Sequence, residues 1–300
     1  MLIIIAIILG QAVVTQPSAL AFDEVVAISH QRTGEVKPPV GHQVVLSIDD
    51  GHRSVYQTVY PLLKRYQMTA TIAVIVNTLT GQRLDYRAIG NFYYITRGEI
   101  KEMIDSCKIE IASHSLSHPW LTQLDSVRAW EEIYRSRVVL ESLFGVGVVT
   151  FVYPYGDMNS RVRKLVERAG YRAARAVRQD EVNFWLDRYR LPVFELRNGV
   201  ALESVKIYVL NHQVSILLLH RIVAKPRVFT EWSAKEFAEL LAWLDEIGVK
   251  TVRLADLYYD WRRDVVGKLI TESRSGLDLV DADSLFKYVD IDATRTFHPR

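Results

Sequence analysis

The sequence predicts an α/β fold, a distorted (β/α) barrel of about seven parallel strands surrounded by helices. Short apolar, β-branched segments alternate along the middle of the chain with amphipathic segments of helical period. The strand segments are apolar almost throughout, which is typical of parallel strands covered on both faces. Seven or eight such segments within about 220 residues favour a barrel over an open sheet.

The individual elements follow from this alternation. The expected strands cover residues 44–48, 70–76, 109–112, 148–152, 171–177, 214–219 and 250–254. The expected helices cover residues 54–67, 99–106, 126–145, 160–170 and 233–247. Pro61 should kink or restart the first helix because proline has no backbone N–H. Ser126 and Ser233 are expected to cap the third and fifth helices, since a hydroxyl satisfies free N–H groups. Gly145 and Gly248 should follow their ends.

The composition limits the kind of site the chain can carry. Of 300 residues, 37 are Lys or Arg and 35 are Asp or Glu, so the formal net charge is only +2. No nucleic-acid partner is expected, because phosphate binding usually shows as clustered positive charge. The single cysteine, Cys107, excludes an intramolecular disulfide framework and a Cys-rich zinc site. A metal ion would therefore be held by histidines and carboxylates.

The two ends of the chain differ from its middle. The start is apolar from Leu2 to Leu9 and offers a small-x-small cleavage site at residues 19–21. We expect a cleaved signal or an uncleaved anchor, and hence a secreted or extracytoplasmic protein that touches a membrane only there. A misassigned start or a buried strand stays open, since no basic residue precedes the run. The expected divisions are 1–21 signal or anchor, 22–38 linker, 39–262 catalytic domain and 263–300 extension of unknown role.

Polar residues interrupt the pattern where strands end. Barrel enzymes place their active sites at the C-terminal ends of the strands, so these residues are expected to share one rim. They are Asp49 and Asp50 after the first strand, His114 and His118 after the third, Tyr155 after the fourth, Arg175 late in the fifth and His220 after the strand ending at Leu219.

The residue types on this rim suit a metal-dependent hydrolase. Two histidines four residues apart, His114 and His118, can reach one metal ion from a single turn of chain. With Asp50 they make an Asp-His-His set with open positions, and the neighbouring Asp49 is then placed to act as a base. Each feature also has an explanation without catalysis. The two histidines could be surface or core residues, and the two aspartates could belong to an acidic loop that caps a helix. His220 is either a satisfied core histidine or a proton carrier.

These residues together resemble the polysaccharide deacetylase family, carbohydrate esterase family 4, also called the NodB homology domain. The resemblance covers about 200 residues in order. Its motifs T-F-D-D-G, H-[ST]-x-x-H-P, a variant third motif ending P-Y-G, and L-x-H resemble SIDDG at 47–51, HSLSHP at 114–119, FVYPYG at 151–156 and LLH at 218–220. The first two motifs are specific as a pair, whereas the last would be weak alone.

The resemblance implies roles for the matching residues. Asp49 would be the catalytic base, and Asp50, His114 and His118 the ligands of one divalent metal ion, with zinc favoured and other first-row ions open. The water bound to that ion would be the nucleophile. The Tyr155 backbone N–H would help hold the oxyanion, His220 would be the general acid, and Leu218 would line the acetyl pocket.

Two departures from the family pattern leave partners open. Many members have an arginine where Val152 stands, and that arginine orients the catalytic aspartate. Arg175 on the next strand is the candidate replacement, and a surface arginine is the alternative. The aspartate-rich fourth motif is not clear, so the partner of His220 is undetermined. Arg221 also stands where an acidic residue is common.

The implied activity is removal of N-acetyl groups from N-acetylhexosamine residues of a polysaccharide, with release of acetate. Trp120 and the aromatic run 92–94 are candidate substrate walls, with core packing as the alternative. Other readings are an O-acetyl esterase such as an acetyl-xylan esterase, another C–N amidohydrolase, a catalytically silent glycan-binding module, or a purely structural secreted barrel. The acetylated glycan and the oligomeric state stay open.

Overall fold

The computed structural model describes residues 42–80, 93–177 and 187–257, and the structure reported below is that of these residues. At its centre lies strand β1 (Gln43–Ile48), which is buried along most of its length. The strands follow the order β5-β4-β3-β2-β1-β7-β6, and every pairing is parallel. The other strands are β2 (Thr71–Val74), β3 (Glu110–Ser113), β4 (Thr150–Val152), β5 (Ala173–Arg175), β6 (Phe194–Glu195) and β7 (Val214–Leu219).

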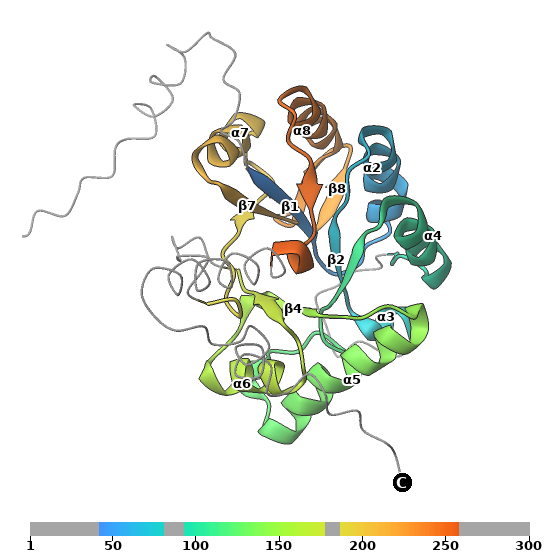
Figure 1. Ribbon diagram of the computed structural model, residues 1–300, viewed down its shortest axis with the longest axis vertical. Helices are drawn as coiled ribbons and strands as arrows, with labels where there is room; N and C mark the ends of the chain where they lie inside the picture. The colour runs from blue at the N-terminus through green and yellow to red at the C-terminus, as the bar shows by residue number, and fades with distance from the viewer. Residues whose placement is uncertain (1–41, 81–92, 178–186, 258–300) are drawn as a thin grey trace, which may run out of the picture. The chain divides into compact units, whose positions relative to one another are not determined.

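The sheet curls into an incomplete barrel with helices around its outside (Figure 1). β10 (Thr251–Val252) pairs with the N-terminal half of β1, on the side where β2 pairs with the C-terminal half. The predicted distorted barrel of about seven parallel strands is confirmed. The helices are α2 (Tyr60–Tyr66), α3 (Val76–Thr80), α4 (Arg97–Cys107), α5 (Ser126–Phe144), α6 (Ser160–Arg168), α7 (Leu202–Asn211) and α8 (Ala234–Glu246).

The two faces of the strands form two separate apolar layers. Side chains of one parity point into the barrel, and those of the other parity pack against the helices, because successive residues of a strand face opposite sides. The outer layer is the larger cluster and includes Leu46 and Ile72. The inner cluster consists of Val45, Ala173, Leu191, Val193, Ile216, Leu218, Leu254 and Leu257.

The predicted first helix divides as expected at Pro61. A π-helical turn, η1 (Val55–Val59), precedes α2, and Pro61 stands in the first turn of α2. A proline is tolerated there because the first N–H groups of a helix have no intrahelical acceptor.

The prediction that Ser126 caps α5 is wrong by one residue. The cap is Asp125, whose carboxylate accepts hydrogen bonds from the N–H groups of Val127 and Arg128. A carboxylate reaches these groups as well as a hydroxyl does, and its negative charge also interacts favourably with the positive end of the helix dipole. Gly145 follows the helix in a left-handed conformation, as predicted.

Several elements between β5 and α8 were not predicted from the sequence. These are β6, α7, and the pair β8 (Arg221–Val223) and β9 (Glu231–Ser233). The strands are only two or three residues long, too short to show a period.

The predicted signal or anchor at 1–21, the linker at 22–38 and the extension at 263–300 lie outside the described residues, so these divisions stay predictions. Within the described ranges, no helix is long and apolar enough to cross a membrane.

Candidate active site

The structure brings the predicted site residues to one rim of the barrel. Each lies at or just past the C-terminal end of a parallel strand, where side chains from neighbouring strands converge. In chain order they are Asp49 and Asp50 after β1, His114 after β3, Tyr155 in the turn η3 (Pro154–Gly156) after β4, Arg175 as the last residue of β5, and His220 after β7.

Asp50, His114 and His118 form a compact set of potential metal ligands. The Nε2 atoms of the two histidines lie 3.0 Å apart. Asp50 Oδ1 lies 3.5 Å from Nε2 of His114 and 3.6 Å from Nε2 of His118. One carboxylate oxygen and two imidazole nitrogens directed at a common point fit a divalent cation with open coordination positions.

The protonation of this set also suits a metal ion. Burial, followed by the nearby His114, lowers the pKa of His118 to about 3, so its imidazole is neutral at ordinary pH. Burial alone would raise the pKa of Asp50, but the neighbouring imidazoles of His114 and His52 hold that pKa well below its ordinary value. A neutral imidazole and an ionised carboxylate are the forms that bind a metal.

A second contact orients each of two ligands. His114 Nδ1 lies 2.8 Å from the carbonyl oxygen of Val152. Since a carbonyl can only accept, Nδ1 carries the proton and Nε2 presents its lone pair to the centre. His52 Nε2 lies 3.2 Å from Asp50 Oδ2, whereas the other oxygen, Oδ1, is the one near His114 and His118. The ring of His52 is stacked on that of Tyr94, with centroids 5.4 Å apart.

The backbone at this rim adopts left-handed conformations at four residues that are not glycine. Asp50, Ser115, His118 and Tyr155 have φ values of 68°, 63°, 64° and 58°. Such conformations are uncommon for these residue types and collect at functional sites. The Ser115 hydroxyl accepts a 2.9 Å hydrogen bond from the His118 N–H, which stabilises the turn carrying both histidines.

Asp49 and Arg175 form an ion pair inside the barrel. Nη2 of Arg175 donates to Oδ1 of Asp49, and the two side chains are 0% and 3% exposed. The other oxygen of Asp49, Oδ2, lies 4.0 Å from His114 Nε2. The arginine that sequence reasoning singled out therefore contacts the candidate base, and it does so from the strand β5 rather than from β4.

His220 and Leu218 occupy the end of β7. Leu218 is fully buried in the inner apolar cluster. The Nδ1 atom of His220 is buried and has no hydrogen-bond partner among the described residues. The charge of Arg221 is paired, because its Nη1 lies 2.7 Å from Oε1 of Glu231.

Trp120 stands beside the candidate metal ligands and is not core-packed. Its ring is stacked on Tyr155 with centroids 4.1 Å apart and an angle of 6° between the planes, and the residue is 46% exposed. Tyr155 in turn contacts the edge of His118, with centroids 4.5 Å apart. Asp157 accepts hydrogen bonds from the N–H and hydroxyl of Thr122, which links the loop of Trp120 to that of Tyr155.

The other aromatic candidates divide into three cases. Phe92 lies outside the described residues. Tyr93 is 80% exposed, and Tyr94 lies under His52.

Sequence reasoning missed His52, the residue that contacts the outer oxygen of Asp50. Its position directly after Asp-Asp-Gly was the available signal. The direction of a histidine side chain one residue past a turn depends on the fold. The contact of His52 with Asp50 was therefore not predictable from the sequence.

The architecture and this cluster define the class: a parallel α/β barrel with a potential metal site at the C-terminal ends of its strands. The sequence model of the family described as polysaccharide deacetylase matches residues 37–174. Over that part, which is just under half of its length, the chain is similar to the polysaccharide deacetylase family.

Individual relatives agree with this assignment. The putative polysaccharide deacetylase YxkH of Bacillus subtilis is 31% identical over 135 residues, which are 45% of this chain and 44% of that protein. The poly-beta-1,6-N-acetyl-D-glucosamine N-deacetylase of Escherichia coli K12 is 24% identical over 167 residues, 45% of this chain and 25% of that protein. The chain thus spans less than half the length of both relatives.

The fold has close counterparts among solved structures. A mutant of the peptidoglycan deacetylase PdaC from Bacillus subtilis superposes with a TM-score of 0.52 over 78% of this chain and 98% of that one, at 19% identity. At this identity the likeness concerns the fold alone.

Proposed function

We propose that this protein is a metal-dependent hydrolase that removes N-acetyl groups from N-acetylhexosamine residues of a polysaccharide and releases acetate. The observation that carries the proposal is the Asp50, His114 and His118 cluster lying beside an aspartate, Asp49, that is fixed by a buried arginine. The match to the family model supports it, as does the name of a relative, a poly-beta-1,6-N-acetyl-D-glucosamine N-deacetylase.

Asp50, His114 and His118 would hold one divalent cation, with zinc favoured by the ligand types and other first-row ions open. Such an ion, when bound, polarises an amide carbonyl and acidifies water. An Asp-His-His set leaves positions for both water and substrate.

The chain's own residues would supply the proton transfers. Asp49, held in place by Arg175, would accept the proton of the attacking water. The backbone N–H of Tyr155 would donate to the oxyanion that develops on the acetyl group. His220 would protonate the amine, which leaves poorly without a proton. Leu218 would line the space for the acetyl methyl, and Trp120 with Tyr155 would form an aromatic wall for the sugar.

Acetate release from a panel of N- and O-acetylated glycans, with metal-stripped and metal-restored protein, tests the proposal. N-acetylated substrates should release acetate only after metal is restored. Asp49→Asn should lower turnover by at least about 10²-fold while metal still binds, and His118→Ala should lose the metal. Wild-type acetate release by Asp49→Asn would contradict the base assignment.

The same panel separates the alternatives. Release from O-acetylated substrates alone would indicate an esterase, and activity on a different linear amide alone another C–N amidohydrolase. Tight metal and glycan binding without any acetate release would indicate a silent glycan-binding module.

We also propose that the protein acts outside the cytoplasm, because polymeric glycans are reached there and the apolar run 2–9 fits an export segment or anchor. Cell fractionation with an antibody to the protein tests this, and a purely cytoplasmic signal would contradict it.

A further inference from the structure

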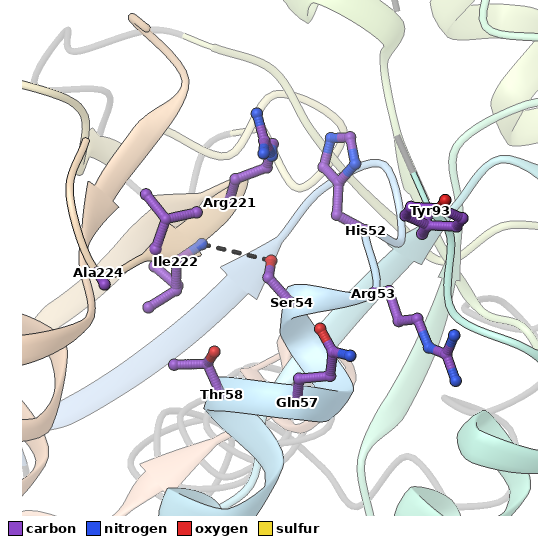
Figure 2. Close-up of a pocket in the computed structure, with 10 residues that line it drawn as sticks. His52, Arg53, Ser54, Gln57, Thr58, Tyr93, Arg221, Ile222 and Ala224 are labelled. Carbon is purple, nitrogen blue, oxygen red and sulfur yellow. Dashed lines mark hydrogen bonds between the residues drawn. The ribbon is translucent and has the colours of Figure 1, made fainter. Parts of the chain in front are cut away.

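A pocket lies beside His52, between the segments that follow β1 and β7 (Figure 2). Its walls come from residues 52–54, 57 and 58 after β1, from Tyr93, and from residues 221–224 after β7. Its volume of about 340 Å³ lies within the range of small-ligand pockets. Apart from Tyr93, which belongs to the aromatic run predicted as a substrate wall, no lining residue has a role in the sequence motifs or in the proposed chemistry.

The pocket is adjacent to the candidate catalytic centre. His52 lines it while its Nε2 lies 3.2 Å from Asp50 Oδ2. Arg221 lines it on the other side and directly follows His220 in the chain. A molecule that fills the pocket therefore lies next to whatever occupies the metal centre.

Hydrogen bonds between the walls fix their spacing. The Ser54 hydroxyl accepts from the Ile222 N–H at 3.4 Å, as the dashed line in Figure 2 shows. The Arg53 N–H donates to the Tyr93 carbonyl at 2.8 Å. The two segments that follow β1 and β7 and the segment of Tyr93 are thus joined around the pocket.

The charges in the pocket are already compensated. Nη2 of Arg53 lies 3.0 Å from Oε1 of Glu99, and Nη1 of Arg221 lies 2.7 Å from Oε1 of Glu231. None of the described residues that line the pocket is a carboxylate. Besides the His52 ring and the Tyr93 hydroxyl, the lining residues offer the hydroxyls of Ser54 and Thr58 and the amide of Gln57. These groups suit an uncharged ligand rich in hydroxyl groups.

The exposed ring of Tyr93 supplies an apolar surface at the rim. Tyr93 is 80% exposed, although its backbone is held by Arg53. A pyranose presents both an apolar face of C–H groups and a periphery of hydroxyls. An aromatic ring beside hydroxyl and amide groups matches both features.

We propose that this pocket binds an uncharged sugar residue of the glycan, next to the residue whose acetamido group enters the metal centre. The inference rests on the proposed function. Trp120 and Tyr155 belong to the loops after β3 and β4, on the other side of β1 in the strand order. The glycan would therefore cross the rim from the Trp120 wall to the Tyr93 pocket, and the protein would favour oligomers over single sugars.

The test compares Tyr93→Ala and Gln57→Ala with the wild type on two substrates. One is the tetramer of N-acetylglucosamine, and the other is 4-nitrophenyl acetate, which is too small to fill both places. We expect kcat/KM for the tetramer to fall about tenfold, mainly through KM, and the rate with the small ester to stay within twofold. Tyr134→Ala, an exposed tyrosine on α5, is the matched control and should change neither substrate.

The outcomes separate the pocket from the function. If the wild type releases acetate from no substrate, the proposed function fails. If it is active and both pocket variants behave like Tyr134→Ala on the tetramer, the pocket assignment is overturned while the function stands. A Tyr93-dependent preference for oligomers that carry carboxylates or sulfates would overturn the assignment to an uncharged sugar.

Discussion

The pair of Asp49 and Arg175 is the most demanding residue-level feature of the rim. Both side chains are buried, and Arg175 has no second carboxylate partner among the described residues. Removing one member of such a pair strands the other charge in a medium of low polarity, which costs far more than losing an exposed pair. The pair therefore contributes to the stability of the barrel and also holds the candidate base, Asp49, in place.

Arg175→Ala should lower the free energy of unfolding by about 3–5 kcal/mol. Arg163→Ala is the matched control, because Arg163 also bonds an aspartate, Asp187, at 3.2 Å but is 36% exposed. The control should cost about 0–1 kcal/mol. Denaturant unfolding of both variants measures the difference, and equal costs would contradict the role of burial. Replacing both members, Asp49→Asn with Arg175→Met, should recover stability but not acetate release.

His52 is the second residue whose contact has a measurable consequence. Its Nε2 meets the outer oxygen of Asp50, and groups that orient a metal ligand typically change metal affinity about 10–100-fold when removed. His52→Phe keeps an aromatic ring over Tyr94 but loses the donor. We expect a weaker zinc affinity of that size, measured by competition with a chromophoric chelator.

The control for His52 lies in the same chain. His212 is also stacked on a tyrosine, Tyr208, with centroids 3.9 Å apart. His212→Phe should leave zinc affinity unchanged, and His52→Gln, which keeps an N–H donor, should restore part of it. Equal affinities of His52→Phe and His212→Phe would show that the contact does not orient Asp50.

At the scale of elements, the loops after the strands determine where the site residues point. The turn η3 presents Tyr155 only because Gly156 lets the chain pass close to Val177, two residues past the end of β5. Gly156 has a φ of 68°, and a Cβ placed there would lie 2.5 Å from the backbone nitrogen of Val177. The close approach leaves no room for a side chain, and the left-handed conformation adds strain for a residue other than glycine.

Gly156→Ala should therefore cost more stability than Gly145→Ala. Gly145 has nearly the same φ, 67°, but open space around it, so it isolates the cost of the conformation. We expect the free energy of unfolding to fall about 1–3 kcal/mol further in Gly156→Ala. It should also lose acetate release, because the Tyr155 N–H would move. Equal stabilities of the two variants would contradict the close approach.

At the scale of the whole molecule, the two ends of the barrel serve different purposes. Glu110 begins β3 at the end opposite the rim and is buried. Its carboxylate accepts hydrogen bonds from the hydroxyls of Thr71 and Thr150 and from the Ala255 N–H. It thus joins three strands to the segment after β10.

Burial raises the pKa of Glu110, whose three hydrogen bonds only partly oppose the shift. The folded state therefore keeps this proton to a higher pH than the unfolded chain. The contribution of Glu110 to stability is full at pH values below about 4.3 and is lost as pH rises through the raised pKa. Glu110→Gln should remove this loss, so the stability difference between variant and wild type should grow in the variant's favour with rising pH. Urea midpoints from pH 4 to 8 measure it, and a constant difference would contradict the raised pKa.

Sequence periodicity was informative where elements are long or fully apolar. β7 has the predicted bounds, and α4, α5 and α8 differ from theirs by only one or two residues at either end. Periodicity is a poorer guide to burial, because the apolar side chains of Val127 and Val138 on α5 are 74% and 45% exposed. The face a helix buries depends on its rotation against the sheet, which its own sequence does not fully specify.

The sequence by itself determined the fold class and the set of polar residues at the strand ends, because parallel strands bring their C-terminal ends to one edge whatever the details of packing. Only the tertiary structure decided which of these residues touch. The pairing of Asp49 with Arg175 joins residues 126 positions apart, and the contact of His52 with Asp50 depends on a left-handed turn. Such contacts arise from side-chain direction and barrel curvature, and neither is encoded in local periodicity.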